Sequence, residues 1–242
     1  MRRSGPPLTY DAVPGRIHPD DDMKHPQDAD AAHYASVGRS AIAAIGQALS
    51  AADRSFDDVE ACLDMPCGYG RVLRMLAHEI PGERITACDI NRKAIRFCAS
   101  EFGATPLRST PNLDRVRFGR YDLIWCGSLV THIDERRAER LLRRFADALV
   151  PGGVAIVTIH AEPPLTGPYA PLRGQITAAL QERGHFHVPY ENALFDYGHA
   201  WHSQQYVRQA FAVVSDDAVR LVSHQTRGWD DHQDVLAFRR DA

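Results

Sequence analysis

Two acidic residues and two glycines, placed at the ends of predicted strands, are the residues whose types and spacing best indicate a binding site. Asp64 ends an apolar stretch and is followed by Gly68, Gly70 and a helix that opens at Arg71. The glycines let the backbone approach a ligand, and the unpaired N–H groups of the helix start suit a carboxylate or phosphate. Asp89 ends the next apolar stretch, where a carboxylate can accept hydrogen bonds from ribose hydroxyls. The spacing predicts a nucleotide-type pocket.

The turn lacks two glycines of a dinucleotide-binding loop. In the pattern G-x-G-x-x-G, the place of the first glycine is taken by Pro66 and that of the third by Leu73. Asp64 would also repel a pyrophosphate, whereas it would favour a ligand that carries an ammonium group and a sulfonium. A nicotinamide-dependent oxidoreductase, with Asp89 on the ribose, is therefore the disfavoured alternative.

The turn resembles the first motif of class I S-adenosylmethionine-dependent methyltransferases, commonly written D-x-G-x-G-x-G. Here it stands as Asp-Met-Pro-Cys-Gly-Tyr-Gly over residues 64–70. The proline is a departure, and with Arg71 the sequence reads D-x-P-C-G-x-G-R, which is similar to a bacterial branch of the family. The resemblance extends over residues 34–149 and weakens beyond Ile159.

The resemblance implies S-adenosylmethionine as the cofactor. Asp64 would lie near the methionine amine, Asp89 would bind the ribose, and Ile90 would pack on the adenine. Ser109 and Thr110 occupy the usual position of adenine-amine contacts, although the acid often found there is absent. The implied cofactor-binding residues are Asp64, Pro66, Cys67, Gly68, Gly70, Arg71, Asp89, Ile90, Ser109, Thr110 and Gly127.

Two histidines follow predicted strands at the edge of the sheet where ligands bind. Methyl transfer is an in-line displacement at an activated carbon, so the protein chiefly positions a nucleophile and removes its proton. His132 opens the helix after the fourth strand, and His160 directly ends the fifth. We predict both as catalytic residues, His160 with the near-neutral pKa of a general base. A packing or capping role for His132 and a solvated His160 are the alternatives.

A polar turn near the C-terminus suits a polyhydroxylated acceptor. Residues 227–234 read Arg-Gly-Trp-Asp-Asp-His-Gln-Asp and are similar to bacterial relatives that carry G-W-D-x-H-Q-D. The alternative is a solvated hairpin with one anchoring tryptophan. The predicted substrate-binding residues are Trp229, His232, Gln233 and Tyr190, the last from an aromatic and histidine-rich insertion. The spacing of the histidines in that insertion does not establish a metal site, and we assign no metal.

The acceptor is predicted to be a small molecule or a saccharide, methylated at a hydroxyl oxygen. The formal charge is −3, and the 28 basic residues are interleaved with 31 acidic ones, so a nucleic-acid partner is not expected. The sequence Cys-Gly-Ser-Leu at 126–129 also differs from the N/D-P-P-Y/F/W loop of nucleic-acid amino methyltransferases. A protein that binds the cofactor without turning it over is a further alternative.

Strands and helices must alternate to position these residues. Apolar stretches predict strands at 61–65, 84–89, 105–107, 121–126 and 154–159, and helical spacing predicts helices at 29–49, 71–79, 91–102 and 135–149. Two last strand-like stretches, 218–223 and 234–238, predict an antiparallel hairpin. The fold class is α/β: a Rossmann-like, mostly parallel seven-stranded sheet with helices on both faces.

The chain length of 242 residues fits a single domain. We expect a flexible arm over residues 1–28 and a methyltransferase domain over residues 29–242, with a lid-like insertion at about 161–202. No apolar stretch is long enough for a membrane span and no signal peptide is recognised, which favours a cytoplasmic location. The five cysteines lack CxxC spacing, so neither a disulfide nor a zinc site is expected.

Overall fold

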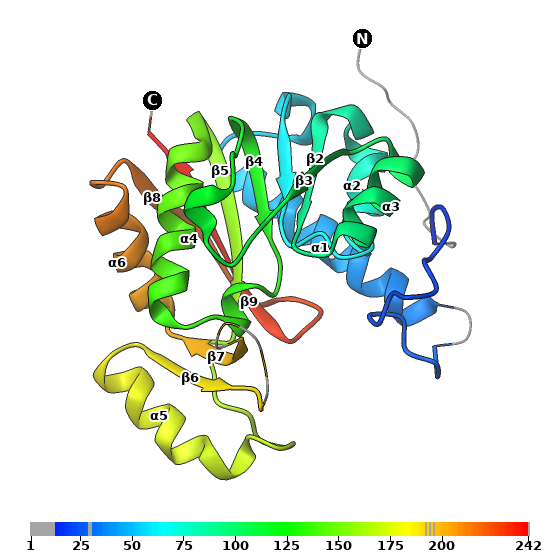
Figure 1. Cartoon of the computed structure of the whole chain (residues 1–242). Helices are drawn as coiled ribbons and strands as arrows, with labels where there is room; N and C mark the ends of the chain where they lie inside the picture. Colours follow the sequence, from blue (N-terminus) through cyan, green and yellow to red (C-terminus); the bar gives the residue numbers. More distant parts are fainter. Residues whose placement is uncertain (1–12, 29–30, 192, 194, 196, 242) are drawn as a thin grey trace.

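The structure, a computed structural model, describes residues 13–28, 31–191, 193, 195 and 197–241 of the chain. A seven-stranded sheet lies at its centre, in the order β3-β2-β1-β4-β5-β9-β8 (Figure 1). Its strands are β1 Cys62–Asp64, β2 Ile85–Asp89, β3 Thr105–Arg108, β4 Tyr121–Cys126, β5 Leu149–Ile159, β8 Val219–Trp229 and β9 Gln233–Arg240. The first five are parallel, whereas β9 is antiparallel to both β5 and β8. The predicted Rossmann-like sheet and its C-terminal hairpin are confirmed.

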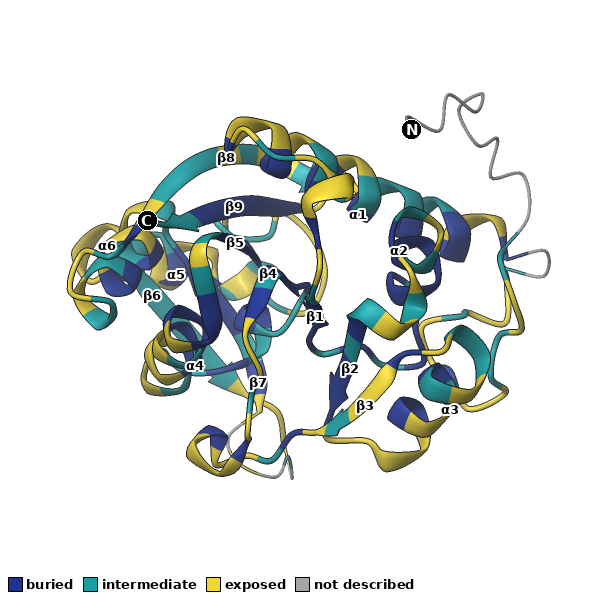
Figure 2. Cartoon of the chain, turned by 90° about the horizontal axis from the view of Figure 1, so that it is seen from above, coloured by how far each residue is buried: buried dark blue, intermediate teal, exposed yellow. Residues whose placement is uncertain are grey.

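Helices cover both faces of this sheet. The alternation along β4 shows why: Leu123 and Trp125 pack into one apolar cluster with α1 Ala32–Ala51 and α2 Leu73–Glu79. Ile124 and Cys126 pack into the other, with α4 Glu135–Ala148 and α6 Gln204–Val214. Strands buried on both faces appear dark in Figure 2, between helices whose outer sides are exposed. Near-continuous apolar strands are typical of such a doubly covered sheet.

The crossover helix α3 Arg92–Phe102 begins where the sequence predicts it. The Asn91 side chain accepts hydrogen bonds from the backbone N–H groups of Lys93 and Ala94, at 3.0 and 3.4 Å. This is the N-terminal cap expected of asparagine. The helix ends at Gly103, which has a left-handed conformation (φ 73°). Helix α3 therefore leads directly out of the turn that contains Asp89.

Residues 13–28, the described part of the arm that the sequence predicts to be flexible, lie against the domain. A fully buried arginine, Arg74 on α2, donates hydrogen bonds to the carbonyl oxygens of Pro14 and Arg16, at 2.8 and 3.1 Å. The hydroxyl of Tyr34 donates to the carboxylate of Asp21 at 2.7 Å, and both groups are buried. The rest of the predicted arm, residues 1–12, lies outside the described residues.

Residues 161–202, which interrupt the alternation in the sequence, add structure beyond the main sheet. They contain α5 Arg173–Glu182 and a separate two-stranded antiparallel sheet of β6 His185–Pro189 and β7 Gly198–His202. Figure 1 shows these elements below the ends of β4 and β5. The insertion therefore lies beside the edge of the sheet at which a ligand is expected.

No helix within residues 13–28 and 31–241, leaving out the undescribed positions, is long and apolar enough to cross a membrane.

Candidate active site

A cavity of about 740 Å³ opens at the carboxyl ends of β1, β2 and β4. The order of the sheet reverses at this point, since β1 lies between β2 and β4, and open α/β sheets bind ligands at such a position. The volume is within the range of small-molecule sites. Of the residues singled out in the sequence, the cavity is lined by Asp64, Pro66, Cys67, Gly68, Arg71, Asp89, Ile90, Ser109, Thr110, Gly127, His132 and Trp229.

Asp64 is a buried carboxylate with an oxygen that no described residue contacts by a hydrogen bond. It is 1% exposed at the end of β1, and its Oδ2 atom has no hydrogen-bond partner. Burial, with the nearby Asp89 as the smaller cause, raises the pKa of Asp64 well above its usual value. An unpaired buried carboxylate is costly, and a cationic donor would relieve that cost. The residue therefore fits the ammonium or sulfonium of S-adenosylmethionine.

Asp89 organises the glycine turn as well as lining the cavity. Its Oδ2 atom accepts a hydrogen bond from the Gly68 N–H at 2.9 Å, and its Oδ1 atom accepts one from the Asn91 N–H at 2.8 Å. Burial raises the pKa of Asp89, and the backbone hydrogen bonds oppose this rise. A carboxylate has further lone pairs, so the ribose hydroxyls of a nucleoside still find acceptors here.

The two glycines of the turn have different roles. Both have positive φ values, 50° for Gly68 and 84° for Gly70. Gly68 lines the cavity, and a Cβ atom there would contact nothing within 4 Å. Gly70 does not line the cavity, and a Cβ atom there would lie 2.9 Å from the Phe102 ring. Gly70 permits the close packing of the turn on α3, and its contact with the cofactor stays a prediction.

Arg71, Trp125 and Trp229 pack together in one part of the cavity lining. The Arg71 guanidinium lies 5.9 Å from the centre of the Trp229 ring, and burial lowers its pKa. Trp229 packs edge-on against Trp125, with ring centres 5.3 Å apart, and its Nε1 atom donates to the Val37 carbonyl at 3.0 Å. Gly127 is required beside them, because a Cβ atom would lie 2.9 Å from Trp125. The ring of Trp229 faces the cavity, but its N–H is already used.

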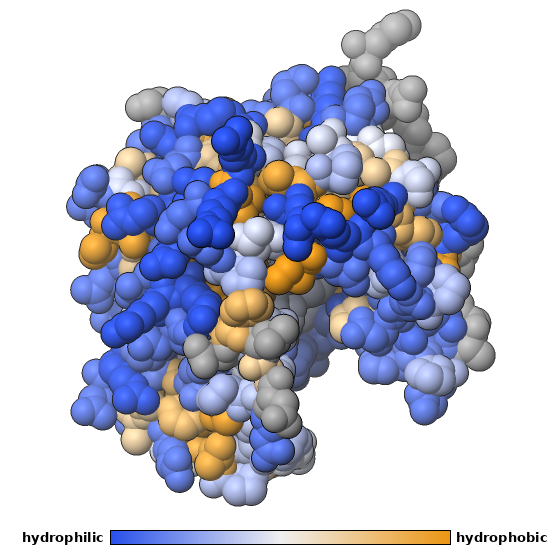
Figure 3. Space-filling model, viewed as in Figure 1, coloured by the Kyte–Doolittle hydropathy of each residue, from blue (hydrophilic) through white to orange (hydrophobic). Residues whose placement is uncertain are grey.

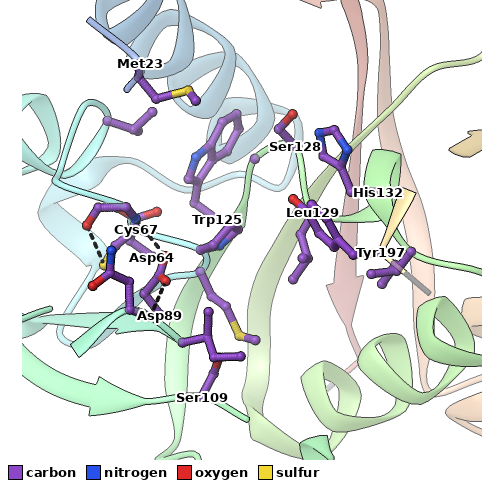
Figure 4. A pocket seen from close by; sticks show the side chains of 18 of the residues that line it. Met23, Asp64, Cys67, Asp89, Ser109, Trp125, Ser128, Leu129, His132 and Tyr197 are labelled. Carbon is purple, nitrogen blue, oxygen red and sulfur yellow. Dashed lines mark hydrogen bonds between the residues drawn. The ribbon is translucent and has the colours of Figure 1, made fainter. Parts of the chain in front are cut away.

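His132 lies on the other side of the cavity, in the short 3₁₀ turn Val130–His132 that follows β4 (Figure 4). Its Nδ1 atom is 2.8 Å from the Gly198 carbonyl oxygen and 3.1 Å from the Tyr190 hydroxyl. Since a carbonyl only accepts hydrogen bonds, Nδ1 carries the proton and Nε2 has a free lone pair. Burial lowers the pKa of His132. The residue is thus neutral and able to take a proton at physiological pH.

His160 does not line this cavity. It is buried at the end of β5, with its ring stacked on His199 at 4.8 Å and edge-on to His232 at 4.9 Å. Burial, with smaller effects of the neighbouring histidines, lowers the pKa of His160 to about 3. The expectation of a near-neutral pKa is therefore wrong. In the described residues, no three His, Cys, Asp or Glu side chains are arranged as metal ligands.

The other predicted substrate residues lie outside the cavity lining. Gln233 is buried: its Oε1 atom accepts from the Thr158 hydroxyl at 2.6 Å, and its Nε2 atom donates to the Ser128 hydroxyl at 3.0 Å. His232 is exposed beside His160. Tyr190 does not line the cavity, but its hydroxyl and its ring both contact His132. Gln233 therefore stabilises the loop after β4, a role that the sequence did not reveal.

Several cavity residues come from segments that the sequence analysis left out of the site. Asp21, Asp22 and Met23 come from residues 13–28. From the other side come Arg137 and Arg140 of α4 and two aromatic residues of the insertion, Phe195 and Tyr197. Figure 4 shows Met23 and Tyr197 on opposite sides of Trp125. The aromatic enrichment of the insertion was the only signal of these contacts in the sequence.

The family model described as "Methyltransferase domain" matches residues 63–155. These residues include β2, β4, the last two residues of β1 and every cofactor-site residue predicted from the sequence. No curated protein matches the chain in sequence.

Solved structures show the same fold at low sequence identity. Human N-acetylserotonin methyltransferase with S-adenosylmethionine is 14% identical, with a TM-score of 0.55 over 85% of this chain and 52% of that one. The magnesium protoporphyrin IX methyltransferase of Synechocystis PCC 6803, with bound S-adenosylhomocysteine, is 16% identical (TM-score 0.55; 89% and 86% covered). The N-terminal domain of EvdMO1, in the presence of S-adenosylhomocysteine and D-fucose, is also 16% identical (TM-score 0.54; 86% and 83% covered). This chain spans about half the length of the human enzyme.

The comparisons support two predictions. Residues 63–155 match a methyltransferase domain, and solved structures with the same fold contain S-adenosylmethionine or S-adenosylhomocysteine.

Proposed function

We propose, with the methyltransferase domain over residues 63–155 as the premise, that this chain methylates a hydroxyl oxygen of a small molecule or a saccharide. One observation carries the proposal: a single cavity holds the unpaired carboxylate of Asp64 and, on its other side, a histidine with a free Nε2 atom, His132. The first group suits a cationic cofactor and the second suits a hydroxyl proton.

Different residues of the cavity bind different parts of the cofactor. Asp64 accepts the ammonium group, Asp89 accepts the ribose hydroxyls, and Ile90 with Ser109 and Thr110 borders the adenine. We assign residues 64–71 to the variant loop D-x-P-C-G-x-G-R, in which Pro66 replaces a glycine. Arg71 lines the same cavity as Asp64, and its guanidinium is suited to the methionine carboxylate.

The reaction needs a proton acceptor on the acceptor side. The cofactor, when bound, supplies a methyl group on a sulfonium, so the acceptor oxygen gains an O–C bond while the C–S electron pair stays on sulfur. His132 takes the hydroxyl proton on Nε2, because Nδ1–H is held by Gly198. Methylation therefore converts neutral His132 into its cation. The largely apolar lining and the net charge of −3 support a small molecule over a nucleic acid.

The experiment is turnover of S-adenosylmethionine labelled in its methyl group, with a panel of alcohols, phenols and glycosides. Calorimetry measures the binding of S-adenosylmethionine and of NAD in parallel. We expect S-adenosylmethionine to bind, NAD not to bind, and label to appear as a methyl ether. Binding of NAD in place of S-adenosylmethionine would favour an oxidoreductase, and cofactor binding without transfer to any acceptor would favour a non-catalytic protein.

A further inference from the structure

Four of the large apolar side chains that are exposed among the described residues line the cavity. Met23, Ile90, Phe195 and Tyr197 are 43%, 51%, 53% and 41% exposed, and all four line the cavity. Leu165, Tyr190 and Val213 are exposed outside the cavity lining. Exposed apolar side chains that cluster at one opening mark a binding surface for an apolar ligand. In the space-filling view, apolar atoms border the hollow at the middle of the face (Figure 3).

Three of these side chains, Met23, Phe195 and Tyr197, come from outside the central sheet, and Met23 and Tyr197 lie on opposite sides of Trp125 (Figure 4). Met23 comes from residues 13–28, whereas Phe195 and Tyr197 come from the insertion. The Tyr197 ring stacks on His132, with ring centres 5.0 Å apart and an angle of 22° between the planes. The predicted base therefore lies against an aromatic ring that is itself partly open to the cavity. A flat ligand that packs on the open side of Tyr197 would lie in the same part of the cavity as His132.

Two of the residues expected to bind a polyhydroxylated acceptor, Trp229 and Gln233, already make hydrogen bonds within the protein. The indole N–H of Trp229 donates to Val37, and both ends of the Gln233 amide are used. Asp234 accepts from His224 at 2.7 Å and from the Arg227 N–H at 2.9 Å. A buried sugar needs a partner for each hydroxyl group. The C-terminal turn supplies few, so the geometry does not favour a saccharide.

The acidity of the acceptor hydroxyl also favours an aromatic acceptor over a saccharide. His132 has a lowered pKa because it is buried, which makes it a weaker base than an exposed histidine. A phenol has a pKa of about 10, whereas water, the nearest reference for an aliphatic alcohol, has one of about 15.7. Proton transfer to a base follows the difference between the two pKa values. A weak base in this position is better matched to a phenol.

We infer that the acceptor is a planar aromatic molecule with a ring hydroxyl, bound between Met23 and Tyr197 with that hydroxyl at His132. The inference rests on the proposed function, which it narrows to one class of acceptor. Tyr197 and Phe195 are then specificity-determining residues.

The test compares 2-naphthol with two matched compounds: decahydro-2-naphthol, which keeps the shape and loses the aromatic ring, and methyl glucopyranoside. Binding of each is measured by calorimetry in the presence of S-adenosylhomocysteine, and methylation is measured separately with labelled cofactor. We expect 2-naphthol to bind and to be methylated at least about 10-fold more efficiently than either control. Tyr197→Ala and Phe195→Ala should each weaken binding of 2-naphthol about 5-fold or more, with the affinity for S-adenosylmethionine unchanged.

Leu165→Ala is the control variant, because Leu165 belongs to the same insertion, is 78% exposed and does not line the cavity. Its affinity for 2-naphthol should equal that of the wild type. Equal use of decahydro-2-naphthol or the glycoside, or unchanged binding in both aromatic variants, would overturn the inference while methyl transfer stands. A protein that does not bind S-adenosylmethionine would overturn the proposed function itself.

Discussion

The Nδ1 atom of His132 lies 2.8 Å from the carbonyl oxygen of Gly198, the first residue of β7. This contact joins the loop after β4 to the insertion and fixes which ring nitrogen carries the proton. Gly198 has no room for a side chain, since a Cβ atom would lie 2.1 Å from the Val188 carbonyl oxygen. The position of the proton on His132 therefore depends on the close approach of β6 and β7, which lie outside the main sheet.

His132→Ala should lower turnover by about 100-fold or more, the usual contribution of a positioned proton acceptor. His160→Ala should lower it much less, because His160 lies outside the cavity lining. Steady-state kinetics with labelled cofactor, together with calorimetry of cofactor binding, would measure both. Equal losses of turnover in the two variants would show that His160 also takes part in catalysis.

The dependence of turnover on pH should report His132. A base must be neutral to accept a proton, and burial lowers the pKa of His132 from its ordinary 6.5. The residue therefore stays neutral to lower pH than an exposed histidine, and turnover should fall only below about pH 6.5. The profile of kcat against pH checks this, with His132→Gln as the control that should lack the acid limb. An inflection above pH 6.5 that is still present in His132→Gln would show that another group causes the acid limb.

Asp64→Asn should weaken the binding of S-adenosylmethionine and yet not destabilise the unliganded protein. The folded state raises the pKa of Asp64, so this carboxyl lowers the stability as pH rises above the ordinary value of 3.8. Removing the charge should raise Tm at neutral pH, with a gain that shrinks as pH falls towards 3.8. Loss of a charge-assisted partner should lower cofactor affinity about 10-fold or more. Calorimetry and thermal unfolding give the two readouts.

Asp89→Ala is the matched comparison, because this carboxylate already bonds to Gly68 and Asn91. It should weaken cofactor binding by about 1 to 3 kcal/mol and should also lower Tm. A rise in Tm with Asp89→Ala, or a fall with Asp64→Asn, would contradict the difference drawn between the two carboxylates.

Arg74→Leu should destabilise the protein and weaken cofactor binding together. The Arg74 guanidinium donates to the Gly70 carbonyl at 3.0 Å as well as to Pro14, Arg16 and the Tyr34 hydroxyl. Several buried acceptors would lose their partner, at about 1 to 3 kcal/mol each. Urea unfolding measures the loss, and Arg136→Leu on the exposed side of α4 is the control. Unchanged cofactor affinity in folded Arg74→Leu would show that residues 13–28 do not contribute to the site.

The sequence predicted most of the fold and the cofactor end of the cavity, because both depend on local patterns. Asp64 and Asp89 each end a strand, and Asn91 caps the helix that follows, so their positions follow from short stretches of chain. Met23 and Tyr197 meet the same cavity from segments with no strand or helix period. Their positions are set by contacts such as that of Arg74 with Pro14, which no local pattern records.

Electrostatic properties were the least predictable part of the site. The lowered pKa of His160 arises from burial among His199 and His232, which are far away in the sequence. The role of Gln233 depends in the same way on its distance to Thr158 and Ser128. Such values require the positions of side chains from several elements at once.

Two groups of segments line the cavity. Its cofactor end is formed by strand ends of the central sheet, and its outer walls are formed by residues 13–28 and by the insertion. The outer walls contribute no strand to that sheet. Evolution can therefore exchange them while the cofactor end keeps its shape, and chimaeras that carry the insertion of another methyltransferase offer a direct route to new acceptors.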